Sequence, residues 1–225
     1  MTKITTQVET VVDPHYKYIK NNQFAIVQAP FCGGQGKSGV EKGPKYMLRH
    51  GLESNLKEIG WETTIESPLN EKYIQEMMER DEITDQFKNT KRPGLVGETT
   101  QTLYQSIAAL AKEKKFVLTL GGDHSIAIGT VSGVQEAYPD VGLLWIDAHA
   151  DINTLESTDS GNLHGCPVSF LMGLNKELEC PPSLKWVPGS LSPDKIVYIG
   201  LRDVDKAEKK IIKDLGIKAY SMYHV

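Results

Sequence analysis

The stretch Val141-Gly142-Leu143-Leu144-Trp145-Ile146-Asp147-Ala148-His149-Ala150-Asp151 holds the pattern from which the architecture of this chain can be inferred. Its first part, residues 141–146, is apolar, which is typical of a strand buried in a sheet. Three side chains able to bind a metal follow at alternate positions, namely Asp147, His149 and Asp151. If the backbone stays extended there, all three point to one side. The stretch therefore predicts a buried strand with a metal-binding edge directly after its end.

Short apolar runs of the same kind recur along the chain, and amphipathic segments lie between them. Strands that alternate with helices and are apolar throughout form a parallel sheet covered on both faces. We therefore expect an α/β fold with three layers, α/β/α, around a mostly parallel sheet, as one domain over residues 1–225. The expected strands are residues 24–27, 61–65, 116–120, 141–146, 196–199 and 217–221, and the expected helices are residues 44–60, 97–114, 124–138 and 207–215.

Residues 70–94 interrupt this alternation. The segment from Lys72 to Arg92 is dense in charged residues and ends at Pro93-Gly94. Charged side chains are mostly found on the surface of proteins. We predict an irregular or partly helical surface excursion for this segment.

The composition excludes several classes of protein. The net charge is −4 and there is no long run of Lys or Arg, which argues against a nucleic acid or an anionic membrane as partner. No apolar stretch approaches the roughly 18 residues that span a bilayer, and residues 1–6 lack the apolar core of a signal peptide. The three cysteines, Cys32, Cys166 and Cys180, form no C-x-x-C pair. We therefore expect a reducing compartment, the cytoplasm.

A glycine-rich stretch, Gly33-Gly34-Gln35-Gly36-Lys37-Ser38, is similar to a phosphate-binding loop. That pattern requires a glycine five positions before Gly36. Phe31 stands at that position, so the pattern fails. We interpret the stretch as a surface loop and do not predict nucleotide binding.

A second strand end adds to the candidate metal-binding edge. Gly121-Gly122-Asp123-His124 follows the strand at residues 116–120, and the carboxyl ends of parallel strands meet at one edge of a sheet. Carboxylate oxygen and imidazole nitrogen without thiolate favour a hard to borderline ion, Mn²⁺ before Mg²⁺, Co²⁺ or Zn²⁺. Two carboxylates that can bridge indicate two ions, which lie about 3.5–4 Å apart in such sites.

The same motifs resemble those of a known family. Gly121-Gly122-Asp123-His124-Ser125 resembles the first signature of the arginase/agmatinase family, and residues 145–154 resemble the second. Ser160-Gly161-Asn162-Leu163-His164-Gly165 follows at the spacing found in arginases, and residues 200–205 are similar to a further arginase segment. The resemblance runs from about Phe24 to the end of the chain.

The resemblance implies a function and a role for each polar residue. The implied reaction is the Mn²⁺-dependent hydrolysis of L-arginine to L-ornithine and urea through a metal-bridging hydroxide, as part of arginine metabolism and the urea cycle. The implied metal ligands are His124, Asp147 and Asp151 for one ion and Asp147 with His149 for the other. The implied catalytic residues are Asp151 and His164, the latter as proton shuttle. The implied substrate-binding residues are His149, then Asn153, Ser160 and Asn162 at the α-carboxylate, and Asp205 and Glu208 at the α-ammonium group.

One segment of the family pattern is not found in this sequence. Arginases carry a later Ser-x-Asp-x-Asp strand end that completes both metal sites, and residues 202–205 match the substrate-binding segment instead. We therefore expect a C-terminally truncated arginase that lacks the last two strands of the family fold. The resemblance places those strands between the strands at residues 116–120 and 141–146. We expect this chain alone to be inactive or weak, and a complete chain to form a homotrimer.

Two other functions stay open. The absent aspartates favour a non-catalytic truncated paralogue that binds or regulates a full-length arginase. An agmatinase-type ureohydrolase is the second alternative. Agmatine has no carboxylate, so Asn153, Ser160 and Asn162 would have no partner on that substrate, which favours arginine.

Overall fold

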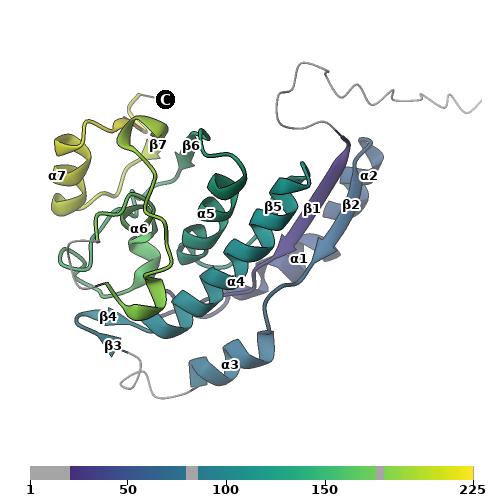
Figure 1. Ribbon diagram of the computed structural model, residues 1–225, viewed down its shortest axis with the longest axis horizontal. Coiled ribbons are helices and arrows are strands. Elements are labelled where there is room, and N and C mark those ends of the chain that lie inside the picture. The colour runs from purple at the N-terminus through teal and green to yellow at the C-terminus, as the bar shows by residue number, and fades with distance from the viewer. Residues whose placement is uncertain (1–20, 80–85, 176–179, 225) are drawn as a thin grey trace, which may run out of the picture.

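The computed structural model describes residues 21–79, 86–175 and 180–224. Its main strands are parallel and form two three-stranded sheets, ordered β2-β1-β5 and β6-β7-β8 (Figure 1). The prediction of an α/β fold with parallel strands is confirmed. The strands are β1 (Gln23–Gln28), β2 (Glu62–Glu66), β5 (Phe116–Leu120), β6 (Leu143–Ile146), β7 (Ile196–Leu201) and β8 (Lys218–Ser221), and a short antiparallel hairpin consists of β3 (Gln86–Phe87) and β4 (Thr90–Lys91).

The helices follow the predicted segments with one main difference. The single helix predicted for residues 44–60 is two helices, because the chain turns at Gly51 with a backbone φ of 90°. Ile59, which continues the apolar stripe of Leu52 and Leu56 in the sequence, is 62% exposed. The helices are α1 (Gly43–Arg49), α2 (Leu52–Glu58), α3 (Glu71–Glu79), α4 (Pro93–Lys112), α5 (Ala127–Ala137), α6 (Pro167–Leu171) and α7 (Lys206–Asp214).

The first sheet, β2-β1-β5, is covered on both faces. Phe24 and Ile26 of β1 belong to a core with side chains from α1 and α2. Ala25 and Val27, which alternate with them, belong to a core with side chains from α4. All four are buried. Figure 1 shows α4 on one side of this sheet and α1 and α2 behind it. The predicted three-layer arrangement is therefore present around the first sheet.

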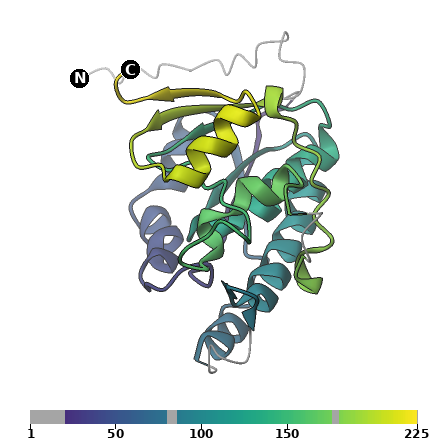
Figure 2. The same cartoon turned by 90° about the vertical axis from the view of Figure 1, so that its left-hand side faces the viewer.

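The second sheet, β6-β7-β8, presents one covered face in the part of the chain that is described. Trp145 and Tyr198 belong to a core with side chains from α6 and α7, and Figure 2 shows α7, in yellow, against strands β7 and β8. The neighbours of Trp145 in β6, Leu144 and Ile146, are 64% and 73% exposed. The opposite face of β6 is thus open to solvent.

The two sheets do not pair with each other. Among residues 21–79, 86–175 and 180–224, no strand is hydrogen-bonded to the outer edge of β5 or of β6. Helix α5 spans this break, since Ile128 belongs to the core of the first sheet and Ala127 to that of the second. A pocket of about 220 Å³ lies there, lined by Val117 from β5 and Leu143 from β6. The resemblance placed two further strands at this break, and their absence from the chain stays a prediction.

The charged segment at residues 70–94 contains α3 and the β3–β4 hairpin. Its residues 80–85 lie outside the described residues, so the interpretation as a surface excursion stays a prediction. None of the described helices is both long and apolar enough to cross a membrane.

Candidate metal centre

His124 follows the carboxyl end of β5 in a short 3-10 helix, His124–Ile126. The turn before it depends on Gly122, whose backbone φ is 120°. A Cβ atom at Gly122 would lie 2.6 Å from the carbonyl oxygen of Phe31 and 2.7 Å from that of Ala29. Glycine is needed here, because any side chain would collide with this neighbouring backbone. The tight turn brings His124 to the carboxyl edge of the first sheet.

Asp123 fixes the same turn through three hydrogen bonds. Its carboxylate accepts the amide of Ser125 at 2.9 Å, the hydroxyl of Ser125 at 2.5 Å and the amide of Gly34 at 2.8 Å. Burial raises the pKa of Asp123, and these hydrogen bonds act in the opposite direction. The amide of His164 in turn donates to the carbonyl of Gly34 at 3.0 Å. Asp123 thus connects the His124 turn to the loop that contacts His164.

The Asp147–Asp151 segment leaves the carboxyl end of β6 as an irregular loop. The amide of Asp147 still donates to Ile199 in β7 at 3.1 Å, and the amide of His149 donates to the carboxylate of Asp147 at 2.9 Å. Asp151 has a φ of 49°, in the left-handed region. The condition of an extended backbone, under which all three side chains would point to one side, is therefore not met, because the chain bends at residues 147–149.

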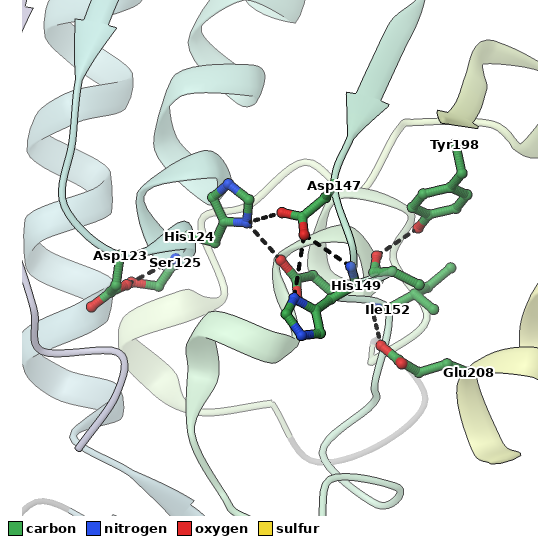
Figure 3. A network of polar contacts seen from close by, with 10 residues as sticks. Asp123, His124, Ser125, Asp147, His149, Ile152, Tyr198 and Glu208 are labelled. Atoms are coloured by element: carbon green, nitrogen blue, oxygen red, sulfur yellow. Dashed lines mark hydrogen bonds and ion pairs between the residues drawn. The ribbon is translucent and has the colours of Figure 1, made fainter. Parts of the chain in front are cut away.

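Three of the four predicted ligands nevertheless converge. His124 Nδ1 lies 2.8 Å from a carboxylate oxygen of Asp151 and 3.0 Å from one of Asp147, and Figure 3 shows the ring of His124 facing Asp147. One ligand atom from each residue lies within 4.8 Å of the others. Neighbouring ligands of an octahedral ion held at about 2.1 Å lie about 3.0 Å apart. The spacing and the O/N donor set therefore fit an ion such as Mn²⁺.

His149 lies at the edge of this cluster. Its Nδ1 is 3.3 Å from the second carboxylate oxygen of Asp147, and its Nε2 is 3.6 Å from the exposed carboxylate of Asp203. Asp147 therefore stands between His124 and His149, with one oxygen toward each ring. Among the described residues His149 is not part of a three-residue ligand group, so its predicted role as a ligand of a second ion stays a prediction.

The electrostatics of the cluster favour a positive charge. The hydrogen bond to Asp151 raises the pKa of His124, as do the charges of Asp151 and Asp147, while burial opposes this. A metal ion requires neutral imidazole, so an ion and a proton compete for the same position between the two carboxylates.

The predicted substrate-binding residues are brought only partly together. The side-chain amide of Asn153 donates to the carboxylate of Asp205 at 2.8 Å, which makes these two neighbours. Ser160 lies on an exposed loop, where its hydroxyl accepts the amide of Asn162 at 3.2 Å. Glu208 is 5% exposed. These substrate roles, and the shuttle role of half-buried His164, stay predictions.

Tyr198 belongs to the surroundings of the site, and sequence reasoning missed it. Its hydroxyl donates to the carbonyl of Ala150 at 2.8 Å, and burial raises its pKa far above the ordinary value for tyrosine. The hydroxyl is therefore protonated and able to donate. In the sequence Tyr198 is one apolar residue of a predicted strand, and no motif marks it.

Comparison with known proteins agrees with this geometry. The sequence profile of the arginase family matches residues 22–225. The arginase of Saccharomyces cerevisiae is 63% identical over 222 residues, which cover 94% of this chain and 66% of the yeast protein. The crystal structure of arginase from Bacillus subtilis superposes with a TM-score of 0.76 at 32% identity, covering 91% of this chain and 65% of that one.

A third relative is the Entamoeba histolytica arginase solved in complex with L-ornithine. It has a TM-score of 0.75 at 30% identity and covers 93% of this chain and 67% of its own. The chain described here spans between half and two thirds of the length of the first curated relatives that it matches. The profile match, the identity to the yeast enzyme and the convergence of His124 with Asp147 and Asp151 lead to one conclusion: the chain belongs to the arginase family.

Proposed function

We propose that this protein is an arginase that hydrolyses L-arginine to L-ornithine and urea with Mn²⁺ as its cofactor. The observation that carries the proposal is the convergence of His124, Asp147 and Asp151, whose facing atoms lie 2.8 and 3.0 Å apart. The names of the relatives support the substrate, since the yeast and bacterial proteins are arginases and the amoebal one was solved with L-ornithine.

The predicted site residues have different roles in this reaction. Two ions held by the predicted ligands would lower the pKa of water and so make hydroxide available at neutral pH as the nucleophile for the guanidinium carbon. The carboxylates of Asp147 and Asp151 would hold these cations in the site. His164 delivers a proton to the leaving amine. Asp205 accepts the α-ammonium group in a charge-assisted hydrogen bond. The polar side chains assigned to the α-carboxylate are Asn153, Ser160 and Asn162.

The test uses a chimeric chain in which these 225 residues are joined to the part of the yeast relative that they do not match. With Mn²⁺ added, we expect urea release from L-arginine and little from agmatine, and loss of both with Asp147→Asn. A preference for agmatine would support an agmatinase instead. Replacing Mn²⁺ by Mg²⁺, Co²⁺ or Zn²⁺ tests the metal, and light scattering tests the proposed homotrimer.

The 225-residue chain alone is a separate proposal. The described residues offer one three-residue ligand group, whereas the proposed reaction uses two ions. We expect this chain to release urea far more slowly than the chimeric chain, even at saturating Mn²⁺. Equal rates of the two chains would contradict this expectation.

A regulatory role is the second candidate function, because within the described part of the chain β5 and β6 have unpaired outer edges and β6 exposes Leu144 and Ile146. Such edges readily pair with another chain. We expect this chain to bind a full-length arginase through this surface. Calorimetric titration of this chain into the purified yeast arginase measures the binding, and Ile146→Lys serves as the surface variant. The idea fails if no heat of binding is seen.

A further inference from the structure

The backbone of Asp151 is unusual for a candidate metal ligand. Its φ of 49° lies in the left-handed region, which is uncommon for any residue except glycine, although aspartate adopts it more often than most. Asp151 is also only 7% exposed, so it is not part of a freely exposed turn. A buried residue in this conformation persists when the structure around it determines its backbone. The contacts that do so are two side-chain hydrogen bonds and one backbone hydrogen bond.

The peptide group before Asp151 is held by Tyr198. The tyrosine hydroxyl donates to the carbonyl of Ala150 at 2.8 Å. Tyr198 lies in the middle strand of the second sheet and its side chain is fully buried. Tyr198 therefore fixes the orientation of the peptide group that precedes the Cα atom of Asp151. The φ angle of Asp151 is the rotation about the bond between this peptide group and Cα.

The peptide group after Asp151 is held by Glu208 and by the start of α6. The amide of Ile152 donates to one carboxylate oxygen of Glu208 at 3.2 Å, and the amide of Val168 donates to the carbonyl of Asp151 at 3.0 Å. Figure 3 shows Glu208 directed at Ile152. Both polar groups of this peptide are thus bonded, and the backbone of Asp151 is constrained on its second side.

Glu208 is itself held by the helix on which it lies. Its second oxygen accepts the amide of Asp205 at 3.2 Å, while Asp205 accepts the amide of Glu208 at 2.9 Å. This reciprocal pair is a capping box at the first turn of α7. Each carboxylate oxygen of Glu208 therefore accepts a backbone amide of this chain. The carboxylate thus connects the first turn of α7 to the loop that carries Asp151.

We infer that Tyr198 and Glu208 are positioning residues that hold the two peptide groups flanking Asp151, so that its carboxylate faces His124 and the proposed ion. Neither side chain touches the ion in this role. The expected effect on Mn²⁺ affinity rests on the proposed metal centre. The constraint on the backbone of Asp151 does not require a metal ion. It gives Glu208 a role different from contact with the substrate.

The experiment compares single substitutions in the whole chain by two measurements. Tyr198→Phe removes only the hydroxyl, and Tyr138→Phe is the matched control, since Tyr138 also donates its hydroxyl to a backbone carbonyl, that of Ala111 at 3.0 Å. Glu208→Ala removes both acceptors, whereas Glu208→Gln keeps one oxygen that can accept the amide of Ile152. The measurements are Mn²⁺ affinity, from the EPR signal of free Mn²⁺, and the NMR chemical shifts of aspartate-labelled chain without metal.

We expect Tyr198→Phe and Glu208→Ala to weaken Mn²⁺ affinity about tenfold or more, the usual effect of losing a group that orients a metal ligand. Both should also displace the backbone resonances of Asp151. Tyr138→Phe should stay within about twofold of the unsubstituted chain, and Glu208→Gln should recover most of the loss. A thermal melt of each variant confirms that folded chains are compared.

The outcomes separate this inference from the metal centre. If Tyr198→Phe behaves like Tyr138→Phe in both measurements, or if Glu208→Gln is as weak as Glu208→Ala, the positioning role is overturned. If the unsubstituted chain binds no Mn²⁺, the proposed metal centre fails, and the resonances of Asp151 alone decide the backbone constraint. Unchanged resonances in Tyr198→Phe would then overturn it, and displaced ones would support it.

Discussion

The first sheet, β2-β1-β5, and the second, β6-β7-β8, contribute to the candidate metal centre in different ways. The first is covered on both faces and supplies His124 from a tight turn. The second has an open face at β6 and supplies Asp147 and Asp151 from an irregular loop. Order at the metal-binding edge therefore does not require that a sheet be covered on both sides.

Each sheet instead has a buried carboxylate next to its ligands. Asp123 accepts amides beside His124 on the first sheet, and Glu208 accepts the amide of Ile152 beside Asp151 on the second. A buried carboxylate that accepts several backbone amides forms charge-assisted hydrogen bonds. These contacts order the loops locally.

The largest expected effect tests the difference in covering between the sheets. Ile26 in β1 is fully buried and Ile146 in β6 is 73% exposed. We expect Ile26→Ala to lower the free energy of unfolding by about 2–5 kcal/mol, and Ile146→Ala by about 0.5 kcal/mol or less. Urea denaturation measures both. A large loss for Ile146→Ala would show that the face of β6 is covered in solution.

The next effect separates the ligands of the second sheet from ordinary surface acids. Asp147 faces both His124 and His149, so Asp147→Asn should weaken Mn²⁺ affinity by about a hundredfold, or about 2.7 kcal/mol. The control is Asp214→Asn, an exposed aspartate paired with Lys210, which should leave the affinity unchanged. Calorimetric titration with MnCl₂ distinguishes them, and equal affinities would remove Asp147 from the site.

A smaller effect probes the carboxylate of the first sheet. Asp123→Ala leaves the buried amide of Gly34 without its acceptor, which should cost about 1–3 kcal/mol of stability. The amide hydrogen of Gly34 should exchange with solvent faster in this variant. The increase should exceed the one expected from the lower free energy of unfolding alone. Asp140→Ala, at an exposed turn residue, should change neither quantity. Unchanged exchange at Gly34 would mean that Asp123 does not hold this loop.

The smallest effect concerns the N-terminal cap of α7, the helix that packs against the second sheet. Asp205 accepts the amide of Glu208 at 2.9 Å, so Asp205→Ala should cost about 0.5–2 kcal/mol. Asparagine is as good a cap as aspartate, and Asp205→Asn should therefore retain most of the stability. Circular dichroism during thermal unfolding measures the difference. If both variants lose the same stability, the charge of Asp205 matters and its capping hydrogen bond does not.

Much of the fold could be predicted, because strands and helices leave local patterns in the sequence. The apolar run at residues 116–120 coincides with β5, and the amphipathic segment at residues 97–114 overlaps α4, whose Leu103 and Ile107 are buried. The interruption at Gly51 was missed, since an apolar stripe continues across it and a single glycine costs a helix only about 1 kcal/mol. Local pattern does not show where a helix divides when the apolar spacing on both sides agrees.

The metal cluster could also be predicted in outline, because its ligands follow the carboxyl ends of two apolar strands. These strands, β5 and β6, belong to separate sheets, and α5 packs against the cores of both. The geometry within the loop could not be predicted, since the left-handed conformation of Asp151 depends on contacts with distant residues. Tyr198 lies 48 residues along the chain from its partner Ala150, and Glu208 lies 56 residues from its partner Ile152. Tyr198 is an ordinary strand residue in the sequence. Contacts between such distant positions become visible only when the fold is known.

The open face of β6 has a practical consequence for handling the chain. Leu144 and Ile146 lie exposed on a strand whose outer edge is unpaired among the described residues. An exposed, apolar strand edge is a template for chain-to-chain aggregation. Preparations of the 225-residue chain are therefore expected to lose soluble protein as concentration and temperature rise, and a lysine at position 146 should improve the yield by making that edge repel its own copies.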